Sequence, residues 1–210
     1  MLQYSVQSIE YYECKEWLLY KHYAKRIPNI MYCFGLFNEN KILVGVCTFG
    51  KPASQYLCNG ICGLENSKYV IELNRLITNN DLKKNSLSFF VSKCIKMLPN
   101  CIIVSYADKG QNHNGYIYQA TNFIYTGCTK ERTDINTEDG KHSRHYDKKI
   151  DYTKNRKLRT SKNRYVYFNA NKKLKKKWLS QLNYKIENYP KEKNKNYKCE
   201  YKPNVQTKIF

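Results

Sequence analysis

The stretch KYVIELNRLITNNDLKKNSLSFFVSKCIKMLPNCIIVSYA, residues 68–107, places a helix-like segment between two strand-like segments. Residues 68–77 and 100–107 are rich in the β-branched and aromatic side chains that buried strands favour. Residues 85–98 repeat apolar side chains at helical intervals, and the Asn-Ser pair that opens them supplies an N-cap. This alternation of strand, helix and strand predicts an α/β fold.

The flanking segments extend the same order of elements. Residues 7–23 carry apolar positions at helical intervals and predict a helix that ends before the proline of RIPN. Residues 31–50 predict a hairpin in which NENK forms the turn. Residues 115–123 predict a short helix, and residues 124–129 a returning strand. The predicted fold class is therefore α/β, with a mixed central sheet flanked by helices.

Positive charge is concentrated in the last third of the chain. The 210 residues are enough for one domain with a core, alone or with an appendage, and they carry a formal net charge of +20. Residues 1–139 hold 15 basic and 12 acidic side chains, whereas residues 140–210 hold 22 and 5. We expect an ordinary globular domain over 1–139 and a basic C-terminal region over 140–210, packed on the same domain. A charge surplus of this size favours a polyanionic partner.

The nine cysteines do not form a disulfide pattern. Their number is odd, their spacing is irregular, and the chain is long enough to build a core without covalent links. Cys58 and Cys62 form a C-x3-C pair with no second pair at a matching interval, which favours buried free thiols over a zinc site. The cysteines therefore predict a reducing compartment.

The N-terminal sequence MLQYSVQSIEYYECKEW lacks a basic flank followed by an apolar stretch, and no run of about 18 apolar residues occurs anywhere. Neither secretion nor membrane spanning is expected. Together with the cysteines, this predicts a cytoplasmic protein.

Residues 105–127, SYADKGQNHNGYIYQATNFIYTG, gather one aspartate, one histidine and four tyrosines beside an apolar run. Asp108 ends the predicted strand, and the carboxyl ends of strands are where open α/β sheets place their sites. A partly desolvated carboxylate there could take a proton from an amine, or it could simply cap the next helix. Tyr118 is a candidate general acid, and the alternative is a core aromatic, which is common in a chain with 20 tyrosines.

Two histidines and one arginine are further candidates. His22 closes the first predicted helix, where it could act as a base near neutral pH or be an ordinary surface histidine. With Asp108 and His113 it could form an iron or zinc site, although two histidines and one acid so far apart are a weak pattern. Arg75 lies among apolar neighbours and needs an anion, which could be Glu72, Asp108 or the phosphate of a bound donor.

The basic region interleaves cations with aromatic residues. RKLRTSKNRYVYF, residues 156–168, alternates arginine and lysine with tyrosine, and NKKLKKKWLSQL, residues 171–182, places five lysines at a helix start. Such side chains neutralise phosphates, although a solvated helix from a lysine-biased genome gives similar runs. The candidates for DNA contact are Lys162, Arg164, Lys172, Lys173, Lys175, Lys176 and Lys177. Residues 191–210 lack apolar periodicity and are expected to be disordered until bound.

The order of elements resembles the acyltransferase fold of the GNAT superfamily, and a closer resemblance is to the phage Mom family, a divergent branch of it. The segments that carry the closer resemblance are KHYAKRIPN (21–29), GVCTFGKPAS (45–54), IELNRL (71–76), KNSLSFF (84–90) and residues 105–127, with weaker matches at KNRYVYF (162–168) and ENYPK (187–191). In order and spacing it covers about residues 15–191. One departure is that TNNDLKKNS stands where a GNAT protein carries Q-x-x-G-x-G/A. Another is Leu87, at a position where the Mom family often has an acidic residue.

The resemblance implies an enzyme that modifies N6 of adenine in phage DNA and shields that DNA from restriction in a bacterial host. Taken with the residue chemistry, it assigns catalysis to Asp108, Tyr118 and His22, donor binding to Arg75, Asn85, Ser86 and Ser88, and DNA contact to Ser105, Tyr106 and His113. The implied donor is acetyl-CoA, another CoA ester or an aminoacyl-tRNA, and the implied product carries a glycinamide-type group. The implied partner is double-stranded DNA, from which the adenine is flipped or caught unpaired.

Two other functions fit parts of the sequence. One is a conventional GNAT N-acetyltransferase that acts on a protein or a small amine. The other is a non-catalytic DNA-binding protein, which would bind DNA equally well without Asp108. Modified nucleosides in DNA distinguish both from the DNA-modifying enzyme.

Overall fold

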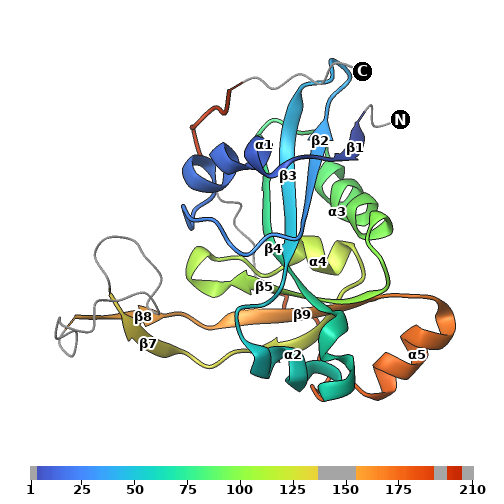
Figure 1. Cartoon of the computed structure of the whole chain (residues 1–210). Helices are drawn as coiled ribbons and strands as arrows, with labels where there is room; N and C mark the ends of the chain where they lie inside the picture. Colours follow the sequence, from blue (N-terminus) through green and yellow to red (C-terminus); the bar gives the residue numbers. More distant parts are fainter. Residues whose placement is uncertain (1–3, 137–154, 192–197, 205–210) are drawn as a thin grey trace.

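The computed structural model describes residues 4–136, 155–191 and 198–204, which form a mixed α/β structure around one large sheet (Figure 1). Its seven strands lie in the order β1-β2-β3-β4-β5-β9-β6. They are β1 (Ser5–Ser8), β2 (Tyr32–Phe37), β3 (Leu43–Gly50), β4 (Val70–Thr78), β5 (Cys101–Asp108), β6 (Ile124–Cys128) and β9 (Lys162–Asn169). Only the β4–β5 pair is parallel, because α3 (Ser86–Met97) crosses between them. The predicted fold class is confirmed.

Helices cover both faces of the sheet. On one face, α3 and α4 (Tyr116–Ala120) pack against apolar side chains such as Ile71, Leu73 and Ile103. On the other face, α2 (Gln55–Cys62) and α5 (Lys172–Ser180) cover the alternate positions of the same strands. Residues two apart on a strand share a face, so the sheet carries a separate core on each side. Cys58 and Cys62 are buried free thiols on α2, as predicted.

The N-terminal helix is shorter than predicted. Residues 7–23 were expected to form one helix, but β1 takes the first of them and pairs antiparallel with β2. The helix α1 (Tyr11–Glu16) follows and continues into a π-helical turn, Trp17–Lys21. The apolar repeat of the segment therefore predicted a helix correctly but placed its start too early. Residues at that start instead form an edge strand, because they pair with β2, which lies outside the segment.

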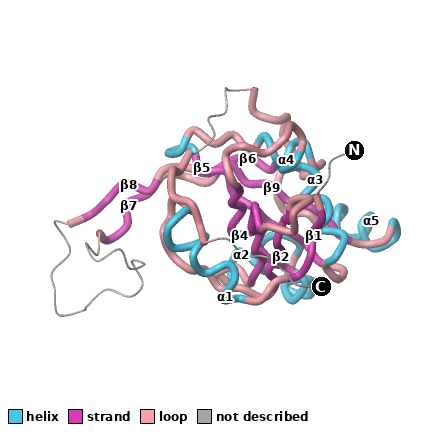
Figure 2. Tube along the Cα trace, turned by 90° about the horizontal axis from the view of Figure 1, so that it is seen from above, coloured by secondary structure: helices cyan, strands magenta, loops and turns pink. Residues whose placement is uncertain are grey.

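The hairpin of β2 and β3, the unit from β4 through α3 to β5, and the α4–β6 segment are confirmed at the predicted places. The sequence interpretation did not identify α2, nor the two-stranded ribbon formed by β7 (Arg132–Ile135) and β8 (Arg156–Arg159). We call this element the β7–β8 ribbon. It projects away from the body of the molecule (Figures 1 and 2).

The basic region contributes a strand to the central sheet. β9 lies between β5 and β6, and its eight residues pair with β5 from Asp108↔Lys162 to Cys101↔Asn169. Trp178 of α5 is fully buried, and its Nε1–H donates to Asn66 Oδ1 at 3.0 Å. The chain on both sides of the predicted boundary at residue 139 therefore builds one sheet, whereas the boundary itself lies outside the described residues.

The described part of the C-terminal tail, residues 198–204, runs along the N-terminal helical segment. Lys21 Nζ donates to the Tyr201 carbonyl at 2.9 Å, the Tyr201 hydroxyl donates to Glu16, and the Asn204 N–H donates to the same carboxylate at 3.1 Å. This part of the tail, expected to be disordered, thus has defined partners. The expectation for 192–197 and 205–210 falls outside the described residues.

Across the described ranges, every helix is too short or too polar to cross a lipid bilayer.

Candidate active site

The two parallel strands separate to form a cleft. β4 and β5 pair only from Val70↔Ile102 to Glu72↔Val104, although both strands continue beyond that point. Where they part, the fully buried Ser105 donates its hydroxyl proton to the Leu73 carbonyl at 2.9 Å. This bond satisfies a carbonyl that a regular sheet would pair with backbone. A cleft of about 1170 Å³ opens beyond it, lined by both strands.

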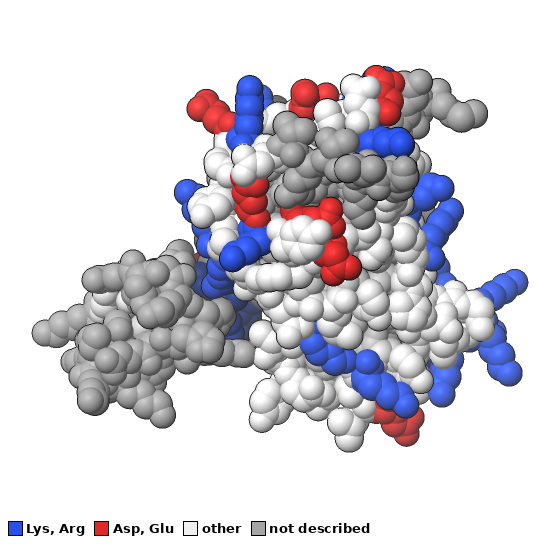
Figure 3. Space-filling view, turned by 45° about the horizontal axis from the view of Figure 1, so that its top comes forward, with Lys and Arg blue, Asp and Glu red and all other residues white. Residues whose placement is uncertain are grey.

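The cleft is strongly cationic. Eleven lysine and arginine side chains line it, against two glutamates, Glu72 and Glu131. Basic side chains are visible in the recess between the body and the atoms drawn grey (Figure 3). A concave surface of this sign attracts phosphate-bearing ligands, because its low-dielectric walls concentrate the potential.

Asp108 holds its neighbours in place. Its Oδ2 accepts from Lys162 Nζ at 2.6 Å, and its Oδ1 accepts from Thr160 Oγ1 at 2.8 Å and from the Gly110 N–H at 3.0 Å. Burial raises the pKa of this carboxyl, but the Lys162 ammonium and the hydrogen bonds from Thr160 and Gly110 outweigh it, so the pKa lies below its ordinary value. A carboxylate with these three donors is ionised and a weak proton acceptor.

His22 is neutral and oriented. It is 8% exposed, so the alternative of a surface histidine is wrong. Burial, followed by the charges of Arg75, His113 and Arg26, lowers its pKa to about 3. Its Nδ1 accepts from the Ala24 N–H at 3.0 Å, which leaves the proton on Nε2. With Nδ1 occupied and Nε2 protonated, His22 can donate a hydrogen bond into the cleft but has no free nitrogen to act as a base.

Tyr23 lies between the two histidines, with ring centroids 4.3 Å from His22 and 5.9 Å from His113. Burial raises the pKa of its phenol, and Asp108 nearby raises it further. Burial lowers the pKa of His113, although Asp108 opposes the shift. All three rings line the cleft, so the structure brings both predicted histidines to the end of β5 that carries Asp108.

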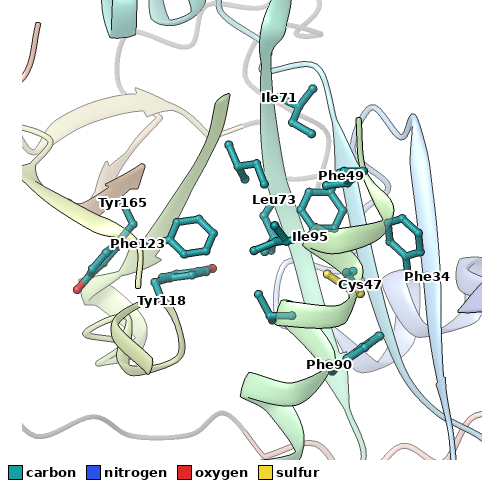
Figure 4. Packing of buried hydrophobic residues seen from close by; sticks show 14 of the residues in the cluster. Phe34, Cys47, Phe49, Ile71, Leu73, Phe90, Ile95, Tyr118, Phe123 and Tyr165 are labelled. Carbon is teal, nitrogen blue, oxygen red and sulfur yellow. The ribbon is translucent and has the colours of Figure 1, made fainter. Parts of the chain in front are cut away.

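Tyr118 lies at the junction of core and cleft. It is 8% exposed, packs against Phe123 and Tyr165, and also lines the cleft. Its phenol points across toward β4 and α3, whereas the Tyr165 hydroxyl points the opposite way (Figure 4). Burial raises the pKa of Tyr118, and its hydrogen bond with Ser105 only partly offsets the shift. Tyr118 is therefore both a core aromatic and a protonated phenol facing the cleft.

Glu72 and Arg75 face the cleft from β4. Burial raises the pKa of Glu72 despite the opposing charges of Arg75, Lys162 and Arg159. Burial also lowers the pKa of Arg75. One Arg75 nitrogen, Nη1, donates to the Asn74 carbonyl at 2.6 Å, while its buried Nε has no hydrogen-bond partner among the described residues. Arg75 thus keeps unused donor capacity for an anion in the cleft.

The start of α3 also borders the cleft, through Asn85, Ser86 and Ser88. Asn85 occupies the N-cap with φ of 68°, but its side chain makes no capping bond. Ser86 donates its hydroxyl proton to the Lys83 carbonyl and Ser88 to the Asn85 carbonyl, so neither side chain caps the helix. Backbone N–H groups of a first turn without side-chain caps are available to an anion.

Three of the residues predicted to contact DNA lie on the sheet face opposite α3, where β4 and β5 separate. Tyr106, Lys162 and Arg164 all line the cleft on the side of α2. Arg164 donates from Nε to Thr126 Oγ1 at 3.0 Å and from Nη2 to the Thr126 carbonyl at 2.9 Å. Its guanidinium lies 3.4 Å from the centroid of the Tyr184 ring. Ser105, by contrast, is fully buried where β4 and β5 separate, and its hydrogen bond to the Leu73 carbonyl joins the two strands there.

The five lysines of α5 lie elsewhere. They are Lys172, Lys173, Lys175, Lys176 and Lys177, all exposed. α5 follows the end of β9 that pairs with Cys101, whereas the cleft lies at the end that pairs with Asp108. Eight strand residues separate the two ends by roughly 25 Å. These lysines and the cleft therefore do not form one site.

In the part of the chain that the structure describes, no group of three or more His, Cys, Asp and Glu side chains is placed to hold a metal ion. The predicted iron or zinc site at His22, Asp108 and His113 has no support.

Sequence reasoning missed Glu72 as a candidate catalytic residue and Tyr23 as a cleft residue. Both lie within quoted segments, IELNRL and KHYAKRIPN, but Glu72 was considered only as a partner for Arg75. The signal that could have identified Glu72 is an acidic residue at a position that would otherwise be apolar in a central strand, because such a residue needs a function or a partner.

Comparisons with known proteins found one relative in sequence and several similar solved structures. Over 113 residues the chain is 31% identical to the methylcarbamoylase Mom of Escherichia phage Mu, and the match covers 51% of this chain and 46% of that protein. A spermidine N-acetyltransferase of Vibrio cholerae, solved with CoA and spermine, aligns at a TM-score of 0.49 and 12% identity, covering 84% of this chain and 98% of that chain. A ribosomal-protein-S5-alanine acetyltransferase of Vibrio fischeri aligns at a TM-score of 0.47 and 10% identity, covering 81% and 96%. The sequence model of the Mom protein family matches residues 3–191, and the chain therefore belongs to that family.

Proposed function

We propose that the protein is a phage-type DNA modification enzyme that transfers an acyl or glycinamide-type group to N6 of adenine in DNA and so protects that DNA from restriction. Family membership supports DNA modification, and the name of the phage Mu relative, a methylcarbamoylase, supports a group of this chemistry. The match spans about half of that relative, so the reaction is a proposal for this chain. The observation that carries it is a cationic cleft that contains a half-buried carboxyl with a raised pKa.

We assign the role of proton acceptor to Glu72. The N6 amine of adenine is a weak nucleophile, because its lone pair is delocalised into the ring. When N6 bonds to the donor carbon, it must lose a proton, and a carboxylate with a raised pKa accepts a proton better than an ordinary one. Asp108 is less suited, since three donors hold it ionised. We propose that Asp108 positions Lys162 instead.

We assign the role of proton donor to Tyr118. As the new bond to N6 forms, the donor's bond to its leaving thiolate or alkoxide breaks, and the leaving atom needs a proton. The Tyr118 phenol is protonated at neutral pH and faces the cleft from the side of α4. Glu72 and Tyr118 lie on opposite faces of the sheet, where β4 and β5 separate. We propose that the proton acceptor and the proton donor reach the reacting groups from these two sides, through the opening between the strands. The His22 Nε2–H then supplies a fixed hydrogen bond.

The donor is proposed to enter from the side of α3. Lys83 and Lys84 line the cleft beside the first turn of α3, and the buried Nε–H of Arg75 has no hydrogen-bond partner in the described part of the chain. This arrangement suits the phosphates of acetyl-CoA, another CoA ester or the end of an aminoacyl-tRNA. When bound, such a donor supplies the activated carbon. The basic cluster supplies anion recognition without the glycine-rich segment that the sequence lacks.

Double-stranded DNA is proposed to follow β9. The β7–β8 ribbon and α5 stand at its two ends (Figure 1), and both carry exposed lysine or arginine side chains. Lys162 and Arg164 lie nearer the ribbon end. A duplex along this line meets basic side chains on both sides of the cleft, and phosphate contacts at several points along it would fix its register.

The test compares DNA from bacterial cells that express the wild type, Glu72→Gln or Glu131→Gln. Both glutamates line the cleft, but Glu131 is exposed and serves as the matched control. We expect wild type and Glu131→Gln to produce a modified deoxyadenosine and resistance to restriction digestion, and Glu72→Gln to lose both. Acetylation of a free amine without DNA, with unmodified nucleosides, would contradict the proposal in favour of a conventional N-acetyltransferase.

A further inference from the structure

The cleft is lined from both faces of the sheet, and we call its parts beside α2 and beside α3 its two mouths. Strand alternation places Glu72, Tyr106 and Arg164 on the sheet face that α2 covers, because their neighbours Val70, Val104 and Val166 pack on that face. The opposite mouth, beside α3, carries Lys83 and Lys84. Residues 52–64, which form the α2 wall, contain no charged side chain. An uncharged wall does not select phosphate.

We propose that the mouth on the α2 side is a stacking site for a nucleobase turned out of a DNA strand, formed by Tyr56 on one wall and by the Arg164 guanidinium lying on Tyr184 on the other. This rests on the proposed function for the identity of the nucleic acid. The proposed stacking site adds to that function the residues that contact the base and the side of the cleft from which the base enters.

The first wall is an aromatic ring with no role in the core. Tyr56 lines the cleft in the first turn of α2, and it is 90% exposed. On the same helix, Cys58, Ile61 and Cys62 are the buried residues that attach α2 to the sheet. The Tyr56 side chain is therefore free to contact a ligand at little cost to stability, and a flat ring at a cleft mouth suits a flat ligand.

The second wall is a fixed planar cation. Two hydrogen bonds to Thr126 hold Arg164, and its guanidinium lies 3.4 Å from the Tyr184 ring centroid. Hydrogen bonds at its edge and the Tyr184 ring on one face restrain the guanidinium, so its other face can contact a ligand with little loss of side-chain entropy. Arginine planes and aromatic rings, tyrosine among them, are surfaces on which proteins stack unpaired bases.

Polar groups lie behind these walls. Glu72 and Tyr106 line the cleft on the same face of the sheet, and burial beside Glu72 raises the pKa of Tyr106, so its phenol stays protonated. A carboxylate accepts a hydrogen bond from the exocyclic amine of a base, and a phenol donates one to a ring nitrogen. A base held between the walls would thus direct its amine toward Glu72.

A fluorescent base analogue tests the site without requiring catalysis. Single-stranded oligonucleotides carrying 2-aminopurine at one position, or an abasic site at the same position, are titrated with wild type and with Tyr56→Ala, Tyr56→Phe and Tyr116→Ala. Tyr116 is the matched control, because it is 70% exposed and lines the same cleft from α4 on the other face. Both tyrosines are exposed, so these variants keep their cores.

We expect stacking to change the 2-aminopurine emission with wild type, Tyr56→Phe and Tyr116→Ala. Tyr56→Ala should lose that change and bind the base-containing strand about tenfold more weakly, the loss typical of one stacked base. Its affinity for the abasic strand should stay at the wild-type level. Equal loss on both strands, or equal loss in Tyr116→Ala, overturns the proposal. Tyr56-dependent stacking with unmodified cellular DNA upholds the site and contradicts the proposed reaction instead.

Discussion

At the scale of single residues, the carboxyls of Asp108 and Glu72 differ because of what surrounds them. Lys162, Thr160 and Gly110 donate to Asp108, and they hold its pKa below the ordinary value. Glu72 is half-buried, and loss of solvent raises its pKa although cations lie nearby. The same functional group is therefore a structural anion at the end of β5 and a candidate base on β4.

Replacing Asp108 with Asn should lower the free energy of unfolding by about 1–3 kcal/mol at pH 7, because Lys162 then loses its partly buried counter-charge. Asp108 has a depressed folded-state pKa, so its stabilising contribution is complete above the unfolded pKa and is lost as pH falls through the folded pKa. Denaturant titrations of both proteins should show a constant difference down to pH values near the ordinary pKa of 3.8 and a closing gap below it. A gap that is already absent at neutral pH would contradict the ion pair.

Replacing Tyr118 with Phe should slow the transfer step by about 10²-fold or more, because the leaving group then has no proton donor. The ring still fills the space beside Phe123 and Tyr165, so the free energy of unfolding should change by no more than about 1 kcal/mol for the lost hydrogen bond. Single-turnover rates on DNA, with denaturation curves as the control, separate these effects. Full activity in Tyr118→Phe would reduce this residue to a core aromatic.

The sequence could identify Asp108 and Tyr118 because a contiguous segment carries both. It could not distinguish their roles, because the partners that decide the state of Asp108, Thr160 and Lys162, come from more than fifty positions later in the chain. The role proposed for Glu72 depends on its burial, which is a property of the sheet and not of the segment that contains it.

At the scale of elements, the segments with strong local periodicity were predictable and those that depend on distant pairing were not. β4, α3 and β5 lie where their apolar patterns indicated. β1 displaced the start of a helix by pairing with β2. The β7–β8 ribbon is only four residues long on each strand and has an exposed surface, so it has little apolar pattern to detect.

The ribbon and α5 make separate predictions for DNA binding. Alanine at Arg132, Arg156 and Lys157 of the ribbon should flatten the dependence of log K on log salt by ~0.9 for each lost phosphate contact. Alanine at the five lysines of α5 should do the same if the duplex reaches that end of β9. Titrations at several salt concentrations measure both slopes. An unchanged slope in either variant would remove that element from the DNA surface.

At the scale of the whole molecule, the sheet separates the two mouths of the cleft, one beside α3 and one beside α2. In the proposed arrangement the cationic mouth beside α3 receives the activated donor, and the mouth beside α2, which has an uncharged wall opposite Arg164, receives the base. β9 connects the second mouth to basic surfaces at both of its ends. Among the described residues of the C-terminal region, basic side chains of β8, β9 and α5 are therefore distributed along β9.

The central claim is that the protein attaches a group to N6 of adenine in DNA, and tandem mass spectrometry of nucleosides tests it most directly. DNA is taken from cells that express the wild type and, separately, Glu72→Gln. We predict a new deoxyadenosine species in the wild-type sample, with the added mass retained on the base fragment and located on the exocyclic nitrogen, and its absence in the Glu72→Gln sample. Unmodified nucleosides from cells with abundant folded wild-type protein, or an added mass on another base, would contradict the claim.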